Sequence, residues 1–592
     1  MADRLDISDL LKNKKGPKAT EYLSGNQDAA IFLPSISSFY TKSLSKKNLR
    51  DGDVPAGLNS FDDFDFLNAN TNVFWYPWAL YSAGHAELDV KKGAVKERVF
   101  HGRDRSATLI VGDSGGYQLS TGVLKGALFT TAIDDLSLDE KGLRHRIMKW
   151  LEHSADYSMI LDIPTTSITN TKSIIFKKNF NALPENDRAL ASMINNINNE
   201  TDTTVDKAKA IADVKKMIEA NPGVCFYDDM GDKTNPVLKQ KYGKYIDIQF
   251  KHPNTTVMFD DCLDYTKWNC EYFIKHRSIG ETKFLNVLQG RKIRAIDDHG
   301  QYFTFTKDQP PLEGDTWWEA VKKFNDPEAL DCEGNKIGDR AFEGWAIPGN
   351  LKFDFQMLMK RFKVMYDEGF LTTHSQGGKL RDDVPLLMHF LGISRINAGL
   401  LYTTIQQEIR KEINPSFIVT YDAASPFLCT AKGKGYSNFV VDHNKMAFRM
   451  DVMPDKDGKQ LSRMFKHLPE NRSSELWENF QFTYIRDGVD YVTHDDTTLG
   501  KMITVGDVCY RDGKPTKKKK DETEEQFKAR LENAIPGNGI DPGTYKEQSL
   551  WDEMGYSAIM NMNVEQHIKG IQTGLKYYTD PNPEVALSNL PI

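Results

Sequence analysis

The chain has 592 residues, of which 40% are hydrophobic and 27% are charged, a balance that is typical of soluble globular proteins and excludes a wholly disordered chain. Its formal net charge of −7 gives no general attraction to nucleic acid, so binding of that kind would require local basic segments. The sequence has no apolar run of about 18 residues, as a membrane span requires, and MADRLDISDLLKNKK at its start lacks the apolar segment of a secretory signal, so we expect a cytoplasmic protein without membrane contact.

The first 64 residues are predicted to be an N-terminal extension, with basic stretches at 12–18 and 42–50. From residue 65 to 440, short apolar runs alternate with amphipathic helical patterns. The runs typical of strands lie at 108–111, 157–161, 256–259, 283–288, 344–347, 385–393 and 416–421. Residues 353–369 and 394–412 carry apolar side chains at helical spacing.

Strands that alternate with helices predict an α/β domain with a parallel sheet covered by helices. About eight repeats would close this sheet into a (β/α)8 barrel of the TIM type, which we expect for residues 65–440, with an open doubly wound sheet as the alternative. Residues of about 167–255 interrupt the pattern with a polar stretch too long for a loop, and we expect an inserted helical element there. Residues 441–592 are predicted to be an α-rich C-terminal region and a candidate nucleic-acid contact, with four lysines at 517–520.

The string GDSGG, within TLIVGDSGGYQLS at 108–120, also surrounds the nucleophilic serine of trypsin-like proteases. Such enzymes need a histidine and an aspartate upstream of the serine, spread over two β-barrels. The histidines upstream of Ser114 are His85 and His101, and neither lies in a protease-like sequence context. In the predicted barrel, DSGG directly follows the C-terminal end of a strand, where active-site groups lie. The glycines allow a tight turn close to a ligand. Asp113 is therefore the candidate reactive group, and Tyr117 offers a flat ring.

Polar residues also follow other predicted strands. Asp162 follows YSMIL, Gln289 follows FLNVL, Gly349 follows GWAI, and Asp422 ends the last strong strand. Carboxylates, an amide and glycines that converge on one barrel mouth suit chemistry at a glycosidic carbon, because one carboxylate can attack while another exchanges a proton with the leaving group.

The segments DSGGYQ, LDIPT, VLQG, AIPG and YDAASP, in this order, resemble the DSGG(F/Y)Q, aspartate-containing, VQGG, AIGGL and FDCVLP segments of the tRNA-guanine transglycosylase family. The resemblance covers residues of about 65–440, and DSGGYQ is its most specific element. It implies that Asp422 is the nucleophile at the anomeric carbon and that Asp113 is the general acid/base for the departing guanine and the incoming 7-deazaguanine. The substrate-binding residues that it implies are Ser114, Gly115, Gly116, Tyr117, Asp162, Gln289, Gly290 and Gly349.

One base-reading residue has two candidates. The segment VMFDDC at 257–262 is similar to an MxFDEC segment of the same family, so Asp260 could replace Asp162 in this role. We favour Asp162, because LDIPT follows DSGGYQ at the expected interval.

The chain also departs from the family. Its AIPGN segment has Pro348 and Asn350 where the family has AIGGL, which predicts a different shape for the base pocket. Lys432 and Lys434 stand where the family has an arginine-bearing segment that grips tRNA, and they are candidate nucleic-acid contacts.

The structural zinc motif of the family, CxCxxC with a distal histidine, is missing. The six cysteines, none of which forms a CxxC pair, are interpreted as reduced thiols, so we expect no metal and no cofactor. A zinc site built from Cys509 with His443, His467 or His494 stays open as an alternative. The cysteines are Cys225, Cys262, Cys270, Cys332, Cys429 and Cys509.

The chain keeps the base-exchange residues but lacks the tRNA-gripping and zinc features of the family. In this it resembles the viral (phage) DNA-guanine transglycosylase branch, whose members insert 7-deazaguanine bases into DNA to resist restriction enzymes. The resemblance implies a DNA-guanine transglycosylase of the host cytoplasm, with DNA and a 7-deazaguanine base, such as 7-cyano-7-deazaguanine, as its partners. The alternatives are a tRNA-guanine transglycosylase without zinc, a hydrolase that releases the base without replacing it, and a non-catalytic barrel that binds nucleic acid. The incoming base, the target sequence and the oligomeric state are left open.

Overall fold

The computed structural model describes the barrel and part of its surroundings. The described residues are 29–45, 58, 60–71, 73–120, 142–164, 173–176, 246–249, 259–280, 282–289, 295–296, 302–303, 316–348, 355–431, 435–442, 447–453, 483–486, 489–492, 497–503, 523–526 and 553–579.

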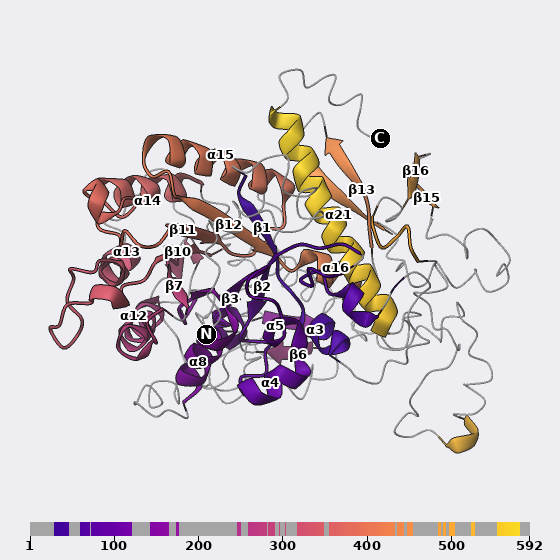
Figure 1. Cartoon of the computed structure of the whole chain (residues 1–592), viewed down its shortest axis with the longest axis horizontal. Helices are drawn as coiled ribbons and strands as arrows, with labels where there is room; N and C mark the ends of the chain where they lie inside the picture. Colours follow the sequence, from indigo (N-terminus) through magenta and orange to yellow (C-terminus); the bar gives the residue numbers. More distant parts are fainter. Residues whose placement is uncertain are drawn as a thin grey trace, which may run out of the picture.

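Eight parallel strands form a nearly closed barrel with helices between them (Figure 1), so the predicted fold class is confirmed. The strands follow one another in the order β1-β12-β11-β10-β7-β4-β3-β2. The two ends of this sheet meet where the Ile36 N–H donates to the Leu80 carbonyl at 2.9 Å. The strands are β1 (Ile31–Pro34), β2 (Trp78–Ser82), β3 (Leu109–Asp113), β4 (Tyr157–Met159), β7 (Lys283–Val287), β10 (Gly344–Ile347), β11 (Leu387–Phe390) and β12 (Ile418–Ala423).

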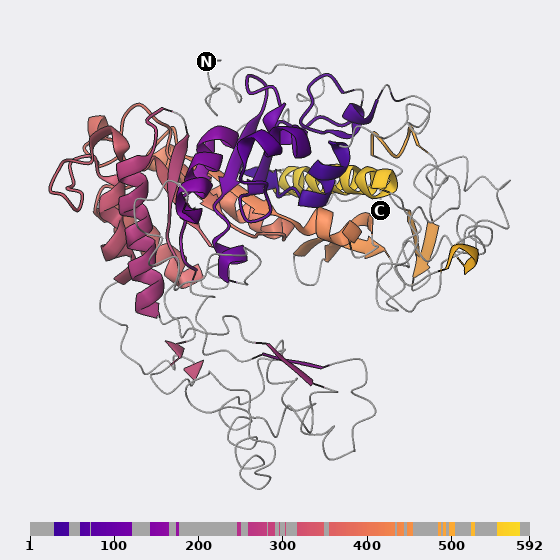
Figure 2. The same cartoon turned by 90° about the horizontal axis from the view of Figure 1, so that it is seen from below.

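Helices cover the outside of this barrel, and the longest of them, α21, runs alongside it in both views (Figures 1 and 2). The α-helices are α3 (Ser38–Leu44), α4 (Val90–Lys96), α5 (Arg98–His101), α6 (Gly116–Ser120), α8 (Leu143–Ser154), α12 (Phe259–His276), α13 (Thr316–Val321), α14 (Phe355–Asp367), α15 (Ile396–Glu412), α16 (Ser425–Ala431) and α21 (Glu553–Thr579). Short 3-10 turns lie at η2 (Phe61–Phe64), η6 (Lys322–Asn325), η7 (Gly338–Arg340) and η9 (His374–Gln376).

Within the described ranges, four antiparallel pairs lie outside the barrel sheet. They are β5 (Ser173–Phe176) with β6 (Ile246–Gln249), β8 (Ala295–Ile296) with β9 (Tyr302–Phe303), β13 (Gly435–Asp442) with β14 (Ala447–Met453), and β15 (Thr483–Arg486) with β16 (Val489–Val492).

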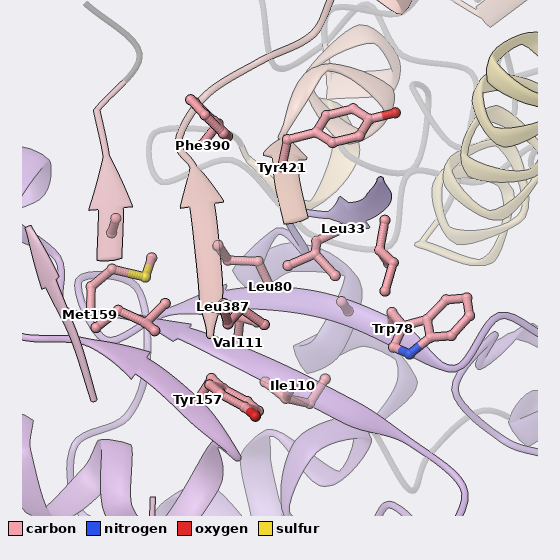
Figure 3. Packing of buried hydrophobic residues seen from close by; sticks show 14 of the residues in the cluster. Leu33, Trp78, Leu80, Ile110, Val111, Tyr157, Met159, Leu387, Phe390 and Tyr421 are labelled. Carbon is pink, nitrogen blue, oxygen red and sulfur yellow. The ribbon is translucent and has the colours of Figure 1, made fainter. Parts of the chain in front are cut away.

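Barrel strands are apolar on both faces because one face fills the interior and the other packs on helices. Buried side chains from several strands form a single cluster (Figure 3), which includes Leu33, Leu80, Val111 and Leu387. On β12, Tyr421 packs outward against α15, where its hydroxyl lies 2.3 Å from the position that a Cβ would occupy at Gly399. Successive side chains of a strand alternate between faces, so Thr420 and Asp422 point to the interior.

Elements of the structure lie across the predicted domain boundaries. Strand β1 lies within residues 1–64, which were predicted to be an N-terminal extension. The prediction left this strand out of the barrel because a run of four residues is too short to be recognised as a strand from the sequence. The boundary between 440 and 441 falls inside β13. Residues of α21 such as Ala558 and Ile559 belong to the same core cluster as the barrel strands, so the C-terminal helix is part of the barrel's packing.

The structure differs from the prediction at the expected strand 256–259 and in the expected helical insertion 167–255. The last residue of the predicted strand at 256–259 begins helix α12 (Phe259–His276), and the other three lie outside the described residues. Of the predicted helical insertion at 167–255, the structure describes the antiparallel pair β5–β6, and the segment with the helical pattern lies outside the described residues.

Candidate functional site

The predicted reactive residues lie at the same end of the barrel. Asp113 is the last residue of β3, and Asp422 is the last but one of β12. Asp162 and Gln289 follow the ends of β4 and β7. Because all these strands are parallel, their carboxyl ends bring the four side chains to one mouth of the barrel.

Asp422 is almost completely buried and is held at one carboxylate oxygen. The Gly392 N–H donates to Oδ1 at 2.8 Å, and the His389 Nε2 atom lies 3.3 Å from the same oxygen. Among the described residues, none donates a hydrogen bond to Oδ2. The carboxylate therefore has one fixed oxygen and one that is open to a ligand.

Asp113 has the opposite electrostatic character. Burial raises its pKa above the ordinary value, and the nearby Asp422 carboxylate raises it further. Hydrogen bonds to the Ser82 side chain and the Gly115 N–H, and the neighbouring His389, lower the pKa only in part. Gly115 has a φ of 84°, a conformation that side chains disfavour. Asp113 thus retains a proton to a higher pH than a solvated aspartate does.

Asp162 and Gln289 form a buried pair next to the glycine turn. The Gln289 Nε2 group donates to Asp162 Oδ2, and burial raises the pKa of Asp162 to about 7 despite this bond. A Cβ at Gly116 would lie 2.7 Å from the Asp162 carbonyl oxygen, so only glycine lets the DSGG turn pack on this loop.

Two buried polar atoms at this mouth have no hydrogen-bond partner among the described residues. Ser114 Oγ and Gln289 Oε1 are both buried, and neither makes a hydrogen bond within the part of the chain that the structure describes. Buried polar groups are normally satisfied, so unsatisfied ones at a barrel mouth indicate a place for a polar ligand. With Asp162 they offer the acceptors and the hydroxyl that the edge of a purine-like base needs.

The remaining predicted residues are placed only in part. Tyr117, on α6, is 63% exposed, so its ring is accessible from outside. Asp260 lies in the first turn of α12, and its side chain is outside the described set, whereas Asp162 contacts Gln289 directly. Four predicted site residues lie outside the described residues: Gly290, Gly349, Lys432 and Lys434.

Two residues beside the carboxylates, His389 and Ser82, were not predicted from the sequence. His389 stands inside the apolar strand β11, where a single histidine gives no signal unless the neighbouring strand and its register are known. Ser82 ends β2, opposite Asp113 in the register of β2 and β3. A polar residue at the end of WALYS could have identified it, had that run been recognised as a strand.

Within the described ranges, no group of three or more His, Cys, Asp and Glu is placed to hold a metal ion. Cys509, His443, His467 and His494, the alternative zinc ligands, lie outside those ranges. None of the described helices has the length and hydropathy needed to cross a membrane.

Comparisons of the chain with protein-family models, with curated proteins and with solved structures found no match.

Proposed function

We propose that this protein is a DNA-guanine transglycosylase, which exchanges guanine in DNA for a 7-deazaguanine base through a glycosyl ester on Asp422. The observation that carries the proposal is the pair of unlike carboxyl groups at the barrel mouth. Asp422 has a held oxygen and an open one, while the pKa of Asp113 is raised by burial and by Asp422 itself. A nucleophile beside a proton donor is the arrangement that base exchange requires.

In the first half of the reaction, Asp422 Oδ2 bonds to C1′ of the target nucleotide as the C1′–N9 bond breaks. The electron pair of that bond goes to the departing guanine, which takes a proton from Asp113. The raised pKa of Asp113 favours this role, because the group keeps its proton to a higher pH than a solvated aspartate does.

In the second half, N9 of the incoming base bonds to C1′ and the Asp422 carboxylate leaves. The N9 proton of the incoming base passes to the Asp113 carboxylate, which restores the starting state. The number of bonds and protons is unchanged, so the exchange needs no cofactor.

In this proposal, base recognition falls to the buried polar atoms for which the described part of the chain offers no partner. Gln289 Nε2 is occupied by Asp162, which leaves Gln289 Oε1 as an acceptor for a base N–H. Ser114 Oγ can donate or accept at the same edge. The ring of Tyr117, which is 63% exposed, would cover the face of the base.

The choice of DNA rests on the sequence. The structural zinc motif of the tRNA enzymes that the sequence resembles is missing, and their tRNA-gripping arginine segment is replaced by one with Lys432 and Lys434, which follows α16, the helix after Asp422. A target guanine in duplex DNA must leave the base stack, which costs roughly a few kcal/mol, so single-stranded DNA should react faster.

The test incubates the protein with labelled 7-cyano-7-deazaguanine and, separately, single-stranded DNA, duplex DNA or tRNA. We expect label in DNA and a covalent protein–DNA adduct that survives denaturation. Asp422→Ala should abolish both, and Asp113→Ala should slow exchange by about 10²- to 10⁴-fold. Asp367→Ala, which removes an exposed carboxylate of α14, is the matched control and should react like wild type.

Each alternative predicts a different result. Label in tRNA alone would support the tRNA enzyme, and abasic sites without incorporated base would support a hydrolase. Binding of DNA without any exchange in wild type would leave a non-catalytic barrel.

A further inference from the structure

His389 has no role in the reaction as described above, although it lies next to its centre. The side chain is completely buried on β11. Its Nδ1 atom is 2.8 Å from Thr420 Oγ1, and its Nε2 atom is 3.3 Å from Asp422 Oδ1. Among the described residues, these are the polar groups that its two ring nitrogens face.

The strand register produces this arrangement. His389 pairs with Thr420 across β11 and β12, and Asp422 is two residues further along β12 on the same face. Thr420 and Asp422 therefore meet the two edges of one imidazole ring. The Thr420–His389–Asp422 row ends at the carboxylate to which the nucleophilic role is assigned.

The hydrogen-bonding needs of the ring select its orientation. A neutral imidazole has one N–H and one acceptor nitrogen. If Nδ1 carried the hydrogen, the Nε2 lone pair would face the Asp422 carboxylate, which is repulsive. If Thr420 donates to Nδ1, the hydrogen lies on Nε2 and faces the Asp422 Oδ1 side at 3.3 Å, a favourable electrostatic contact that does not have the geometry of a hydrogen bond. A protonated ring would present the same Nε2–H to the carboxylate.

We propose that His389 is a positioning residue for Asp422, and this proposal rests on the proposed function. The Gly392 N–H holds Oδ1 by a hydrogen bond, and the His389 Nε2–H adds an electrostatic contact to the same oxygen at 3.3 Å, so that Oδ2 is the oxygen that faces C1′. No proton moves to or from His389 in either half of the reaction.

The contact has a directional effect on the two half-reactions. A carboxylate oxygen is a much stronger hydrogen-bond acceptor than the carbonyl oxygen of an ester. The Nε2–H therefore stabilises Asp422 as the free carboxylate more than as the glycosyl ester. It favours release of the sugar to the incoming base, and its loss should slow that release.

The experiment measures base exchange, KM and the fraction of protein held as covalent adduct at steady state, with single-stranded DNA and saturating 7-cyano-7-deazaguanine. For His389→Leu we expect kcat to fall by about 10- to 100-fold, with KM for DNA within about twofold of wild type. The adduct fraction should rise. His389→Gln, which keeps an N–H donor near the place of Nε2, should recover most of the rate, and Thr420→Val should fall between the two.

A purely structural role would not produce this pattern, since a damaged site loses both rate and adduct. His101→Leu, which removes a histidine of α5 that lies beside His153, ahead of the amino ends of β3 and β4, is the matched control, with exchange expected at the wild-type rate. Two results would overturn the positioning role. In the first, His389→Leu keeps the wild-type kcat. In the second, His389→Gln is as slow as His389→Leu and the adduct fraction falls in both variants. An inactive wild-type protein would instead overturn the proposed function, so the two failures are distinguishable.

Discussion

At the scale of single residues, the site is defined by carboxyl groups whose surroundings differ. Asp422 is held through one oxygen by the Gly392 N–H, Asp113 has a raised pKa, and the pKa of Asp162 is raised to about 7. The chemical types of these residues are in the sequence. Their differences in proton affinity come from burial and from neighbours that are distant along the chain.

The raised pKa of Asp162 makes stability depend on pH. Its pKa in the folded state exceeds the ordinary value of 3.8, so folding favours the neutral form, and this stability is lost as the pH rises towards about 7. Asp162→Asn stays neutral and can still accept from Gln289. Between about pH 5 and about pH 8, the free energy of unfolding of this variant should gain about 3 kcal/mol relative to wild type, measured by urea denaturation. Parallel pH profiles for the two proteins would contradict the raised pKa.

The sequence was informative about residues that follow recognisable strands. Asp113, Asp162, Gln289 and Asp422 were expected at one barrel mouth, and the structure brings them to the same end of the barrel. His389 could not be found in this way, because its position depends on the register between β11 and β12 and not on any local pattern.

At the scale of elements, helix α21 fastens the segment that follows the candidate nucleophile. Asn563 on α21 donates to the Pro426 carbonyl at 3.1 Å and to Thr430 Oγ1 at 2.8 Å, both on α16. The Tyr436 N–H, at the start of β13, donates to Asn563 Oδ1 at 2.9 Å. One side chain therefore ties together the two ends of the connection at 432–434, which carries the candidate nucleic-acid lysines.

We expect Asn563→Leu to lower the free energy of unfolding by about 2 to 4 kcal/mol, because it leaves the Tyr436 N–H and the Pro426 carbonyl buried without this partner. Chemical denaturation measures the change. Thr573→Ala, on the same helix, is the control and should change stability by less than about 1 kcal/mol. Equal stability of the two variants would show that α21 is held by apolar packing alone.

The elements also show where sequence patterns were insufficient. Strands β10, β11 and β12 were predicted because the amphipathic helical patterns of α14 and α15 lie between them in the sequence. The structure contains both helices. Strands β1 and β2 are not separated by a long amphipathic helix that would mark them in the sequence. The four residues of β1 are buried because β12 and β2 flank them in the barrel. The attachment of α21 to the barrel is a contact between distant parts of the chain, which no local pattern encodes.

At the scale of the whole molecule, the two ends of the barrel have different tasks. The candidate site occupies the carboxyl ends of the strands, whereas buried ion pairs lie at the amino ends. Arg277 binds both carboxylate oxygens of Glu343, which immediately precedes β10, at 3.0 and 2.6 Å. The Phe284 N–H of β7 donates to the same carboxylate at 2.7 Å. This division matches the general separation of chemistry and stability in such barrels.

Glu343→Ala should therefore separate stability from activity. It leaves the buried Arg277 guanidinium without its carboxylate, so we expect a loss of about 3 to 5 kcal/mol in the free energy of unfolding. At a temperature where the variant is fully folded, base exchange should stay within about twofold of wild type. Thermal unfolding and exchange rates measured on the same preparation check this. A fall in exchange that exceeds the loss of folded protein would show that the two ends of the barrel are coupled.

The closure of the barrel by β1 has a consequence for how the protein is made. Ile31 of β1 pairs with Thr420 of β12, 389 positions later in the chain. At synthesis rates of about 5 to 20 residues per second, β1 leaves the ribosome roughly 20 to 80 seconds before its partner strand exists. Throughout that interval the apolar IFLP segment has β2 as a neighbour on one side and no partner strand on the side that β12 will occupy. The nascent chain must therefore be shielded or weakly ordered until β12 arrives, and both carboxylates of the candidate site come together only with that last strand.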